Sequence, residues 1–595
     1  MKTREVTISA GAALLAAASF NIAPARGAPG DAAALFDPQT FAAARCSGAS
    51  SGMMRAYSAI GMATLRALVG GTAKQKIDEP LWPGLGTLTY KISTKNKLAQ
   101  SYFDQGLRLT YAFNHGEAIL SFRQAQRLDP KCAMCVWGEA YAYGSNINLP
   151  MEKEAIAPAW MALKKAMTLA PNSSKKEQAL IAALTKRYAE HPPEDRSELD
   201  RAYAGAMANV AKDYVGDADI QTLYAEALMD VRPWDYWQAG GTKPFPEEEA
   251  LVPTLEHAVA LVPNHVGALH LYIHALEATP NVKQAEAAAD RLESLMPAAG
   301  HIVHMPAHIY MRIGRQRDSI NVDLAAIKAD EAFMQSRKDA GFYAAAYYPH
   351  NVHFVLVSAQ LGGDTDTMRA MAKKLEPLIP QELLAPVPIA QTVKAAPMLT
   401  LAHIGDYESV MAQAQPSAET PYLQHMWHFA RGLVMARGKN TKGAEAELKA
   451  MRAVATNKAL DNYPPGQLPA RTLTGIADEI LSARIAQDRG RMNEAITHLT
   501  KASQLQSSLA YTEPPFFYYP VRQSLGGLLL ASGKAKEASD IFRASLLDQP
   551  GNAYALYGLM KSYEKMGDTA AAVETKSQFE RAWLGKTQNI DLAWM

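Results

Sequence analysis

Cysteine is scarce in this chain, and its scarcity excludes one way of holding a large protein together. The 595 residues contain three cysteines, Cys46, Cys132 and Cys135. Three cysteines allow at most one intramolecular disulfide plus a free thiol, so a disulfide-stapled scaffold is excluded. With 48% hydrophobic and 20% charged residues, the chain has the composition of an ordinary folded protein with a hydrophobic core.

An excess of charge and several familiar catalytic motifs are also missing. The formal net charge is +1 and no long basic run occurs, which argues against a nucleic-acid partner. There is no HExxH sequence and no phosphate-binding loop, so the common metalloprotease and kinase mechanisms are not supported. Strand signals are few, and the stretch GLGTLTYKIST at residues 84–94 is the main one.

Long hydrophobic runs are lacking outside the N-terminus. Lys2 and Arg4 precede an apolar stretch from Val6 to Phe20, and the small-residue sequence APA follows at residues 23–25. This pattern predicts a signal peptide over residues 1–25 and hence a periplasmic or secreted protein. The apolar stretch is shorter than the ~20 residues that a membrane span needs, so we expect no span after cleavage.

Helical periodicity, by contrast, dominates from about residue 97 onward. In residues 99–130, small, large and proline residues follow the spacing of a 34-residue helix-turn-helix repeat. Gly106, Ala118, Phe122, Ala125 and Pro130 take positions 8, 20, 24, 27 and 32 of that unit. The small residues allow two helices to approach closely, and the proline ends the second helix.

The same pattern recurs near the C-terminus, where Gly526, Phe542 and Pro550 take positions 8, 24 and 32. We therefore predict an all-α fold over residues 97–595, a tetratricopeptide-like solenoid of helix-turn-helix repeats with long inter-helix loops. The solenoid is expected to wind as a right-handed superhelix. Residues 26–96 are expected to form an N-terminal segment that is partly extended or irregular.

Four insertions interrupt the repeats, at residues 144–152, 232–249, 462–469 and 511–520. Loops of this length in a compact protein are usually functional, with surface decoration or interdomain packing as the alternative. The first two both follow the end of the first helix of a unit. We therefore expect these two loops to lie on the same edge of the solenoid.

Four segments carry a more specific resemblance. They are YFDQGLRLTYAFNHGEAILSFRQAQRLDPKCAMCVWGEAYAYGSNINLPM, HMPAHIYMRIGR, YYPHNVHF and EPPFFYYPVRQSLG. Together with the repeats, they resemble secreted bacterial tetratricopeptide-repeat proteins, many of them without an assigned activity. The resemblance implies the fold, and it implies that positions 2, 5, 9, 12 and 13 of each first helix face the concave groove. It does not imply a reaction, because the site and not the fold decides function.

Histidines are concentrated in one part of the chain. Residues 270–353 hold seven of the fifteen histidines, where an even distribution would place about two. Repeat frames set by glycine, alanine and proline alone place all seven at groove positions of three successive first helices. The seven are His270, His274, His301, His304, His308, His350 and His353. The sequence therefore predicts a histidine-lined groove at residues 265–355.

Neutral imidazoles paired at helical spacing favour a transition-metal site. Copper or zinc is favoured and iron is possible, and seven histidines would suit two ions better than one. Glu277, at a groove position, is a candidate ligand, general base or hydrogen-bond partner of a ligating histidine, and Tyr310 is a second catalytic candidate beside the cluster. A metal-free groove for a small-molecule or peptide ligand and a purely structural role are the alternatives.

The CxxC sequence of Cys132 and Cys135 admits three interpretations: a redox pair, soft metal ligands or a structural disulfide. Val136 follows the second cysteine, so the sequence lacks the histidine of a c-type haem attachment.

The resulting hypothesis is an exported repeat metalloprotein, with a metal-dependent oxidoreductase as its enzymatic form. The alternative is a periplasmic scaffold that binds a protein or peptide without catalysis. Loops closed over the histidines would favour the enzyme, because they would exclude water from a reactive centre, and open loops would favour the scaffold.

Overall fold

The computed structural model describes residues 79–595, apart from 239–240, 338–340, 464–467, 587–589 and 595. The predicted signal peptide at residues 1–25 and most of the predicted N-terminal segment therefore lie outside the described residues.

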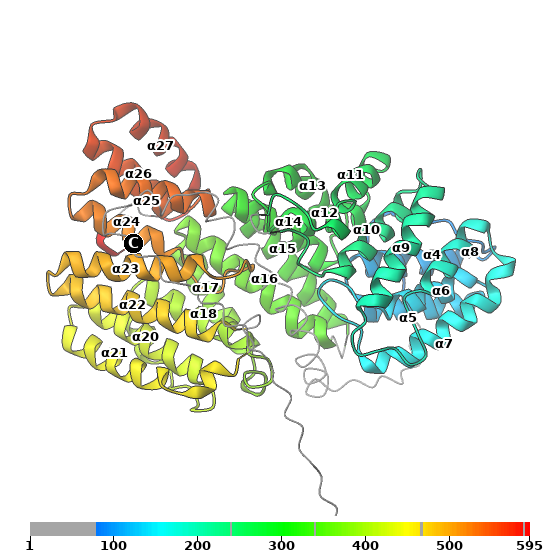
Figure 1. Ribbon diagram of the computed structural model, residues 1–595, viewed down its shortest axis with the longest axis horizontal. Helices are drawn as coiled ribbons and strands as arrows, with labels where there is room; N and C mark the ends of the chain where they lie inside the picture. Colours follow the sequence, from blue (N-terminus) through cyan, green and yellow to red (C-terminus); the bar gives the residue numbers. More distant parts are fainter. Residues whose placement is uncertain (1–78, 239–240, 338–340, 464–467, 587–589, 595) are drawn as a thin grey trace, which may run out of the picture. The chain divides into compact units, whose positions relative to one another are not determined.

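The described chain is all-α, as predicted, and it contains no β-strand; helices are labelled as in Figure 1. The first twelve α-helices are α4 (Lys97–Tyr111), α5 (His115–Leu128), α6 (Ala133–Ala142), α7 (Lys153–Leu169), α8 (Lys175–Leu184), α9 (Ser197–Asp213), α10 (Ala218–Val231), α11 (Leu251–Leu261), α12 (Val266–Leu276), α13 (Glu286–Leu292), α14 (Gly300–Ile313) and α15 (Gln316–Ser336). Twelve more follow: α16 (Gly341–Gly362), α17 (Thr365–Leu375), α18 (Ala390–His403), α19 (Tyr407–Met411), α20 (Pro421–Arg437), α21 (Thr441–Ala455), α22 (Ala470–Asp488), α23 (Met492–Ser507), α24 (Val521–Ala531), α25 (Ala535–Asp548), α26 (Ala553–Met566) and α27 (Thr569–Ala582).

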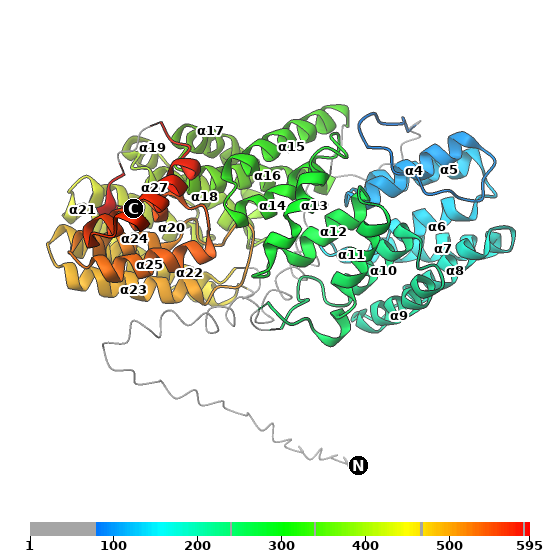
Figure 2. The same cartoon turned by 90° about the horizontal axis from the view of Figure 1, so that it is seen from above.

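Short 3-10 helices lie between these elements. They are η2 (Ala170–Asn172), η3 (Pro246–Glu248), η4 (Val282–Ala285), η5 (Glu376–Leu378), η6 (Gln381–Leu383), η7 (Lys458–Asp461) and η8 (Leu592–Trp594). The α-helices follow one another as antiparallel pairs that pack side by side, and each pair also contacts the next (Figures 1 and 2). The predicted tetratricopeptide-like array of helix pairs is thus confirmed.

The spacing of small and large residues explains how the pairs pack. The ring of Phe122 on α5 lies between Gly106 on α4 and Gly138 on α6, and a Cβ on Gly106 would lie 2.7 Å from that ring. Phe542 on α25 lies in the same way between Gly526 and Gly558. Glycine is required at these helix positions because the phenylalanine occupies the space that a side chain would need.

Three successive first helices, α12, α14 and α16, carry the predicted histidines. Pro306 lies inside α14 and Pro349 lies inside α16, each within the histidine sequence of its helix. Proline removes a backbone donor and breaks the hydrogen-bond ladder locally, so the helix backbone is interrupted beside the histidines. α14 then ends at Gly314, whose φ of 87° gives the left-handed termination that favours glycine.

The C-terminal pairs pack back onto these central helices. Gly314 lies against the backbone of Pro550 and Gly551, between α25 and α26. After α27, the Leu584 amide donates a 2.8 Å hydrogen bond to the carbonyl of Gly362 at the end of α16. These contacts join segments more than 200 residues apart, and they bring the loop before α24 to the histidine helices.

The N-terminal segment packs on the same central region. The Ala298 amide, just before α14, donates a 3.0 Å hydrogen bond to the carbonyl of Gly84. Arg337, after α15, forms ion pairs of 2.6 Å with Glu79 and with Glu117 on α5. The stretch at residues 84–94 begins in a turn and forms no strand, and side chains satisfy part of its backbone, as where the Tyr90 amide donates to Asp104.

Two of the predicted insertions fall where expected. Residues 144–152 connect α6 to α7, and residues 232–249 lead from α10 towards α11. Both therefore lie within a helix pair and follow its first helix. None of the helices in the described ranges combines the length and the apolarity needed to cross a bilayer.

We predict that Phe122→Ala will lower the thermal unfolding midpoint measured by calorimetry. Removing a fully buried phenylalanine between two glycines leaves a cavity that neither glycine can fill, at a cost of about 3–5 kcal/mol. Val573→Ala is the control, because the valine is 64% exposed and its truncation should change stability by less than about 0.5 kcal/mol. Equal midpoints for the two variants would contradict the packing role assigned to Phe122.

Candidate metal centre

The structure brings six of the seven predicted histidines into two adjacent groups of three. In each group, one ring nitrogen from each histidine lies within 4.8 Å of the other two. The first group is His270 and His274 of α12 with His301 of α14, and the second is His304 and His308 of α14 with His350 of α16. The groups adjoin, since the ring centroids of His274 and His308 are 5.9 Å apart.

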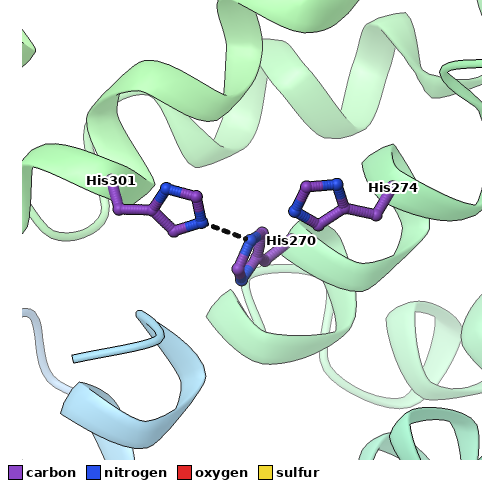
Figure 3. Close-up of side chains that lie close together, drawn as sticks. All are labelled: His270, His274 and His301. Atoms are coloured by element: carbon purple, nitrogen blue, oxygen red, sulfur yellow. Dashed lines mark hydrogen bonds between the residues drawn. The ribbon is translucent and has the colours of Figure 1, made fainter. Parts of the chain in front are cut away.

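The first group is shown in Figure 3, where the three rings turn toward a common point. Nε2 of His301 lies 3.2 Å from Nε2 of His270. Two further ring nitrogens, Nε2 of His274 and Nδ1 of His301, are buried and have no hydrogen-bond partner. Buried polar atoms without partners are rare in folded proteins, so these two nitrogens are candidate positions for a bound ligand or ion.

The second group converges more tightly. Nε2 of His304 lies 2.8 Å from Nε2 of His308 and 3.1 Å from Nε2 of His350. His304 and His308 are one helical turn apart, so the spacing of four residues brings both rings to one face of α14. His350 reaches the same point from α16.

The outer nitrogens of these rings are held by acceptors behind them. Nδ1 of His270 lies 2.7 Å from the carbonyl oxygen of Tyr111, and Nδ1 of His274 lies 2.8 Å from Glu277 Oε1. Nδ1 of His304 lies 2.6 Å from Asp323 Oδ1, on α15. When Nδ1–H donates outward, Nε2 carries the lone pair, and this is the arrangement in which histidines bind metals.

Glu277 and a residue from a distant loop flank His308. Nδ1 of His308 contacts Glu277 Oε2 and lies 2.6 Å from Oε2 of Glu513, in the loop between α23 and α24. These three residues form a third cluster that could hold a metal ion, although it shares His308 with the second group. Glu277, predicted as a ligand or base, thus lies behind the histidine rings and orients two of them.

Burial keeps most of the rings neutral. It lowers the pKa of four histidines well below the usual value, and the neighbouring rings lower it further; the four are His270, His301, His304 and His350. Neutral imidazole is the form that binds Cu, Zn or Fe.

His308 is the exception. Burial lowers its pKa, but Glu277 and Glu513 outweigh burial and raise it to about 10. A proton on Nε2 of His308 could then donate to His304 in the metal-free protein. A metal ion bound between these rings would replace that proton.

Aromatic rings close the space around both groups. Phe113 packs under the first group, with its ring centroid 4.5 Å from His270 and 5.4 Å from His301. Phe354 packs under the second group, with its ring centroid 4.8 Å from that of His304.

Two of the aromatic residues at the site have an unusual backbone conformation. Phe113 has a φ of 55°, and Trp234, which contacts the edge of His274, has a φ of 66°. Strained backbone of this kind is found most often at functional sites.

A cavity of about 240 Å³ adjoins the histidines and is lined by His274, His301, His308, His350 and His353. The inserted loops contribute much of the rest of the lining. The loop at 144–152 contributes Asn148, and the loop at 232–249 contributes three residues. The loop at 511–520 contributes all of residues 511–516 together with Tyr518. The loops thus lie over the histidines, which is the arrangement expected of a water-excluding site.

The structure places the remaining candidates apart from the two groups. His353 lines the cavity but belongs to neither group. The hydroxyl of Tyr310 donates to Asp290 and lies under Arg315, so this predicted catalytic side chain does not reach the cavity. Its repeat position points it into the helix pair, against α13, and not into the groove.

Cys132 and Cys135 form a disulfide at the start of α6. Both cysteines are buried, and neither lines the cavity. The structure thus shows the two cysteines as a disulfide, so neither sulfur is free to act as a thiolate metal ligand.

Sequence reasoning missed Asp323 and Glu513. Asp323 lies on α15, the second helix of its repeat unit. The groove positions used for the prediction belong to first helices only, so they gave no signal for this residue. Glu513 is the only charged residue of the loop at 511–520, a segment whose length and aromatic content already favoured a function. That single acidic residue was the available signal.

No family model matches this chain, and no curated protein matches it. Among solved structures, the human IFIT1 dimer with m7Gppp-AAAA is 13% identical, with 82% of this chain and 90% of that chain covered and a TM-score of 0.29. Yeast Tom70 is 13% identical, with 84% and 95% covered and a TM-score of 0.26. The tetratricopeptide domain of P58(IPK) is 11% identical, with 79% and 99% covered and a TM-score of 0.21. Likenesses this distant carry no argument, so the function is argued from this chain's own residues.

Thiol titration tests the disulfide. In protein unfolded without reductant, we expect one reactive thiol per chain, that of Cys46, because the other two cysteines are joined. After reduction, all three should react. Three reactive thiols before reduction would show that the pair is a dithiol in the purified protein.

Proposed function

We propose that this chain is an exported transition-metal protein that holds two ions side by side, one in each group of three histidines. The observation that carries the proposal is the convergence of the Nε2 atoms of His304, His308 and His350, at 2.8 and 3.1 Å, while outer acceptors hold His304 and His308 from behind. Three imidazoles with anchored outer nitrogens match the ligand sets of histidine-bound metals.

Copper or zinc suits these groups best, and iron is possible. Each group offers only imidazole nitrogens, which are ligands for all three metals. The rings come from three neighbouring helices, so the ligand sets are positioned by packing and need no loop to become ordered. The carboxylates of Asp323 and Glu277 lie behind the rings and offset the positive charge that an ion would bring.

A metal-dependent oxidoreductase is the enzymatic form of this proposal. A redox-active ion such as copper would supply electron-transfer chemistry at the cavity wall. The residues of the chain would orient the ligands, keep the rings neutral by burial, and exclude water through the loops over the cavity. The lining histidines His308 and His350 would place an ion within reach of a molecule in the cavity.

The alternative function is a scaffold that binds a protein or peptide in the groove without catalysis. The repeat fold supports it, because repeat solenoids present extended concave binding surfaces. The loops at 144–152, 232–249 and 511–520 all contribute to the cavity wall, so an extended peptide would have to displace them. Closed loops favour the metal centre over the scaffold.

Elemental analysis of full-length protein, expressed without a histidine tag, tests the metal. We expect two ions of Cu, Zn or Fe per chain. The double variant His304→Ala/His308→Ala should lose one ion, and His270→Ala/His301→Ala should lose the other, since each removes two of three ligands.

The control is His428→Ala/His498→Ala, because these histidines pair with Glu447 and Glu479 outside the two groups. This variant should keep both ions. Wild-type protein that contains no metal and cannot be loaded with any of the three would rule out the metal function and leave the scaffold.

Asp323→Asn tests the outer acceptor separately. The amide is a weaker acceptor for Nδ1–H of His304 and carries no charge, so the affinity of the second group for its ion should fall by about tenfold or more. Competition with a chelator measures this affinity. Glu331→Gln, on the same helix but paired with Lys374, should leave the affinity unchanged, and equal losses in both variants would show that Asp323 has no special role.

A further inference from the structure

The cavity beside the histidines is lined by two kinds of residue. The polar lining includes the histidine rings and Glu277. The apolar lining is partly aromatic and includes Trp234, Trp237, Leu383, Val387, Phe516 and Tyr518. Small-molecule sites in proteins have this composition, with a mainly apolar wall and a few polar groups that orient the ligand. At about 240 Å³, the cavity has room for one small organic molecule.

The charges at the cavity are already paired. No lysine or arginine is among the lining residues that the structure describes. Glu277 and Glu513 pair with His308, and Asp235 pairs with Arg232 at 2.5 Å. In the metal-free protein, a carboxylate or phosphate on a ligand would therefore be desolvated without a free counter-charge among the side chains, which is strongly unfavourable.

One short stretch of the wall offers unused polar atoms. Tyr511 and Thr512 both line the cavity, and their side-chain hydroxyls are buried without a hydrogen-bond partner among the described residues. Arg312 lies over the ring of Tyr511, 5.0 Å from its centroid, and donates to the carbonyl of Glu277. These contacts hold the stretch in place beside the second histidine group.

We propose that this cavity binds one small, uncharged organic molecule with a flat apolar body and a single hydroxyl or similar polar group. The apolar body lies between the aromatic side chains and the inward-facing histidines, and the polar group hydrogen-bonds to Tyr511 and Thr512. The inference deepens the proposed metal function, because it names the class of molecule that would meet the metal centre. It rests on that function for its biological meaning but not for the binding itself.

Two matched probes test the ligand class by calorimetric titration of the full chain. Naphthalene-2-methanol is flat, uncharged and carries one hydroxyl, and naphthalene-2-carboxylate has the same body with a negative charge. In protein freed of metal by a chelator, we expect the alcohol to bind with one molecule per chain, at least tenfold more tightly than the carboxylate. Equal affinities, or tighter binding of the carboxylate, would overturn the proposal.

Two neighbouring alanines on α16 supply the variant and its control. Ala346 lines the cavity, and Ala344 is partly exposed on the same helix without lining it. Ala346→Phe should fill the cavity and weaken binding of the alcohol by at least tenfold, whereas Ala344→Phe should leave it unchanged. If circular dichroism shows that Ala346→Phe is misfolded, Ala345→Leu replaces it, because Ala345 also lines the cavity. Unaltered binding in a folded cavity variant would place the site elsewhere.

The double variant Tyr511→Phe/Thr512→Val tests the polar stretch. It should weaken binding of the alcohol by about fivefold, the effect of losing one ordinary hydrogen bond, and should leave the affinity of the carboxylate unchanged. An equal change for both probes would contradict the assigned contact. The titrations are carried out before and after a chelator has removed the metal. Failure of the metal function would appear as missing metal in the elemental analysis, and failure of the ligand site would appear as missing alcohol binding in the metal-free protein.

Discussion

The arrangement of the central helices depends on one constraint: buried imidazoles must have both ring nitrogens satisfied. The outer nitrogens meet this need through the Tyr111 carbonyl, Glu277 and Asp323. The inner nitrogens then face one another, and they cannot all be satisfied by the protons that neutral rings carry. A metal ion of the kind proposed above would satisfy them, so the packing of the three helices also decides where the metal ligands lie.

Burial of these rings requires contributions from both ends of the repeat array. The turn after α4 brings Phe113 and the Tyr111 carbonyl under the first group. The loop before α24 brings Glu513 to His308 because the last helix pairs pack back against α14 and α16. An open row of helix pairs would leave the histidines in a solvated groove. Contacts from both sides instead produce a small, mainly apolar cavity beside neutral rings.

The sequence was a good guide wherever position within a repeat decides direction. Glycine, alanine and proline set the frames, and those frames placed His301, His304 and His308 together on one face of α14 without any use of the histidines themselves. Tyr310 was predicted as a catalytic candidate beside the cluster, but its hydroxyl contacts Asp290 and its side chain does not line the cavity. Asp323 was not predictable in this way, because it reaches the site from a second helix, whose side chains serve mostly to pack neighbouring units.

The sequence by itself determined the all-α repeat fold, the three helices that carry histidines and the presence of inserted loops, because each depends on local spacing within about one repeat. Only the tertiary structure decided that the histidines divide into two groups and which acceptor holds each ring. It also decided that Glu513 lies 2.6 Å from His308. Such contacts join residues up to about 200 positions apart, and they depend on how small rotations between successive helix pairs add up along the array, which no local pattern encodes.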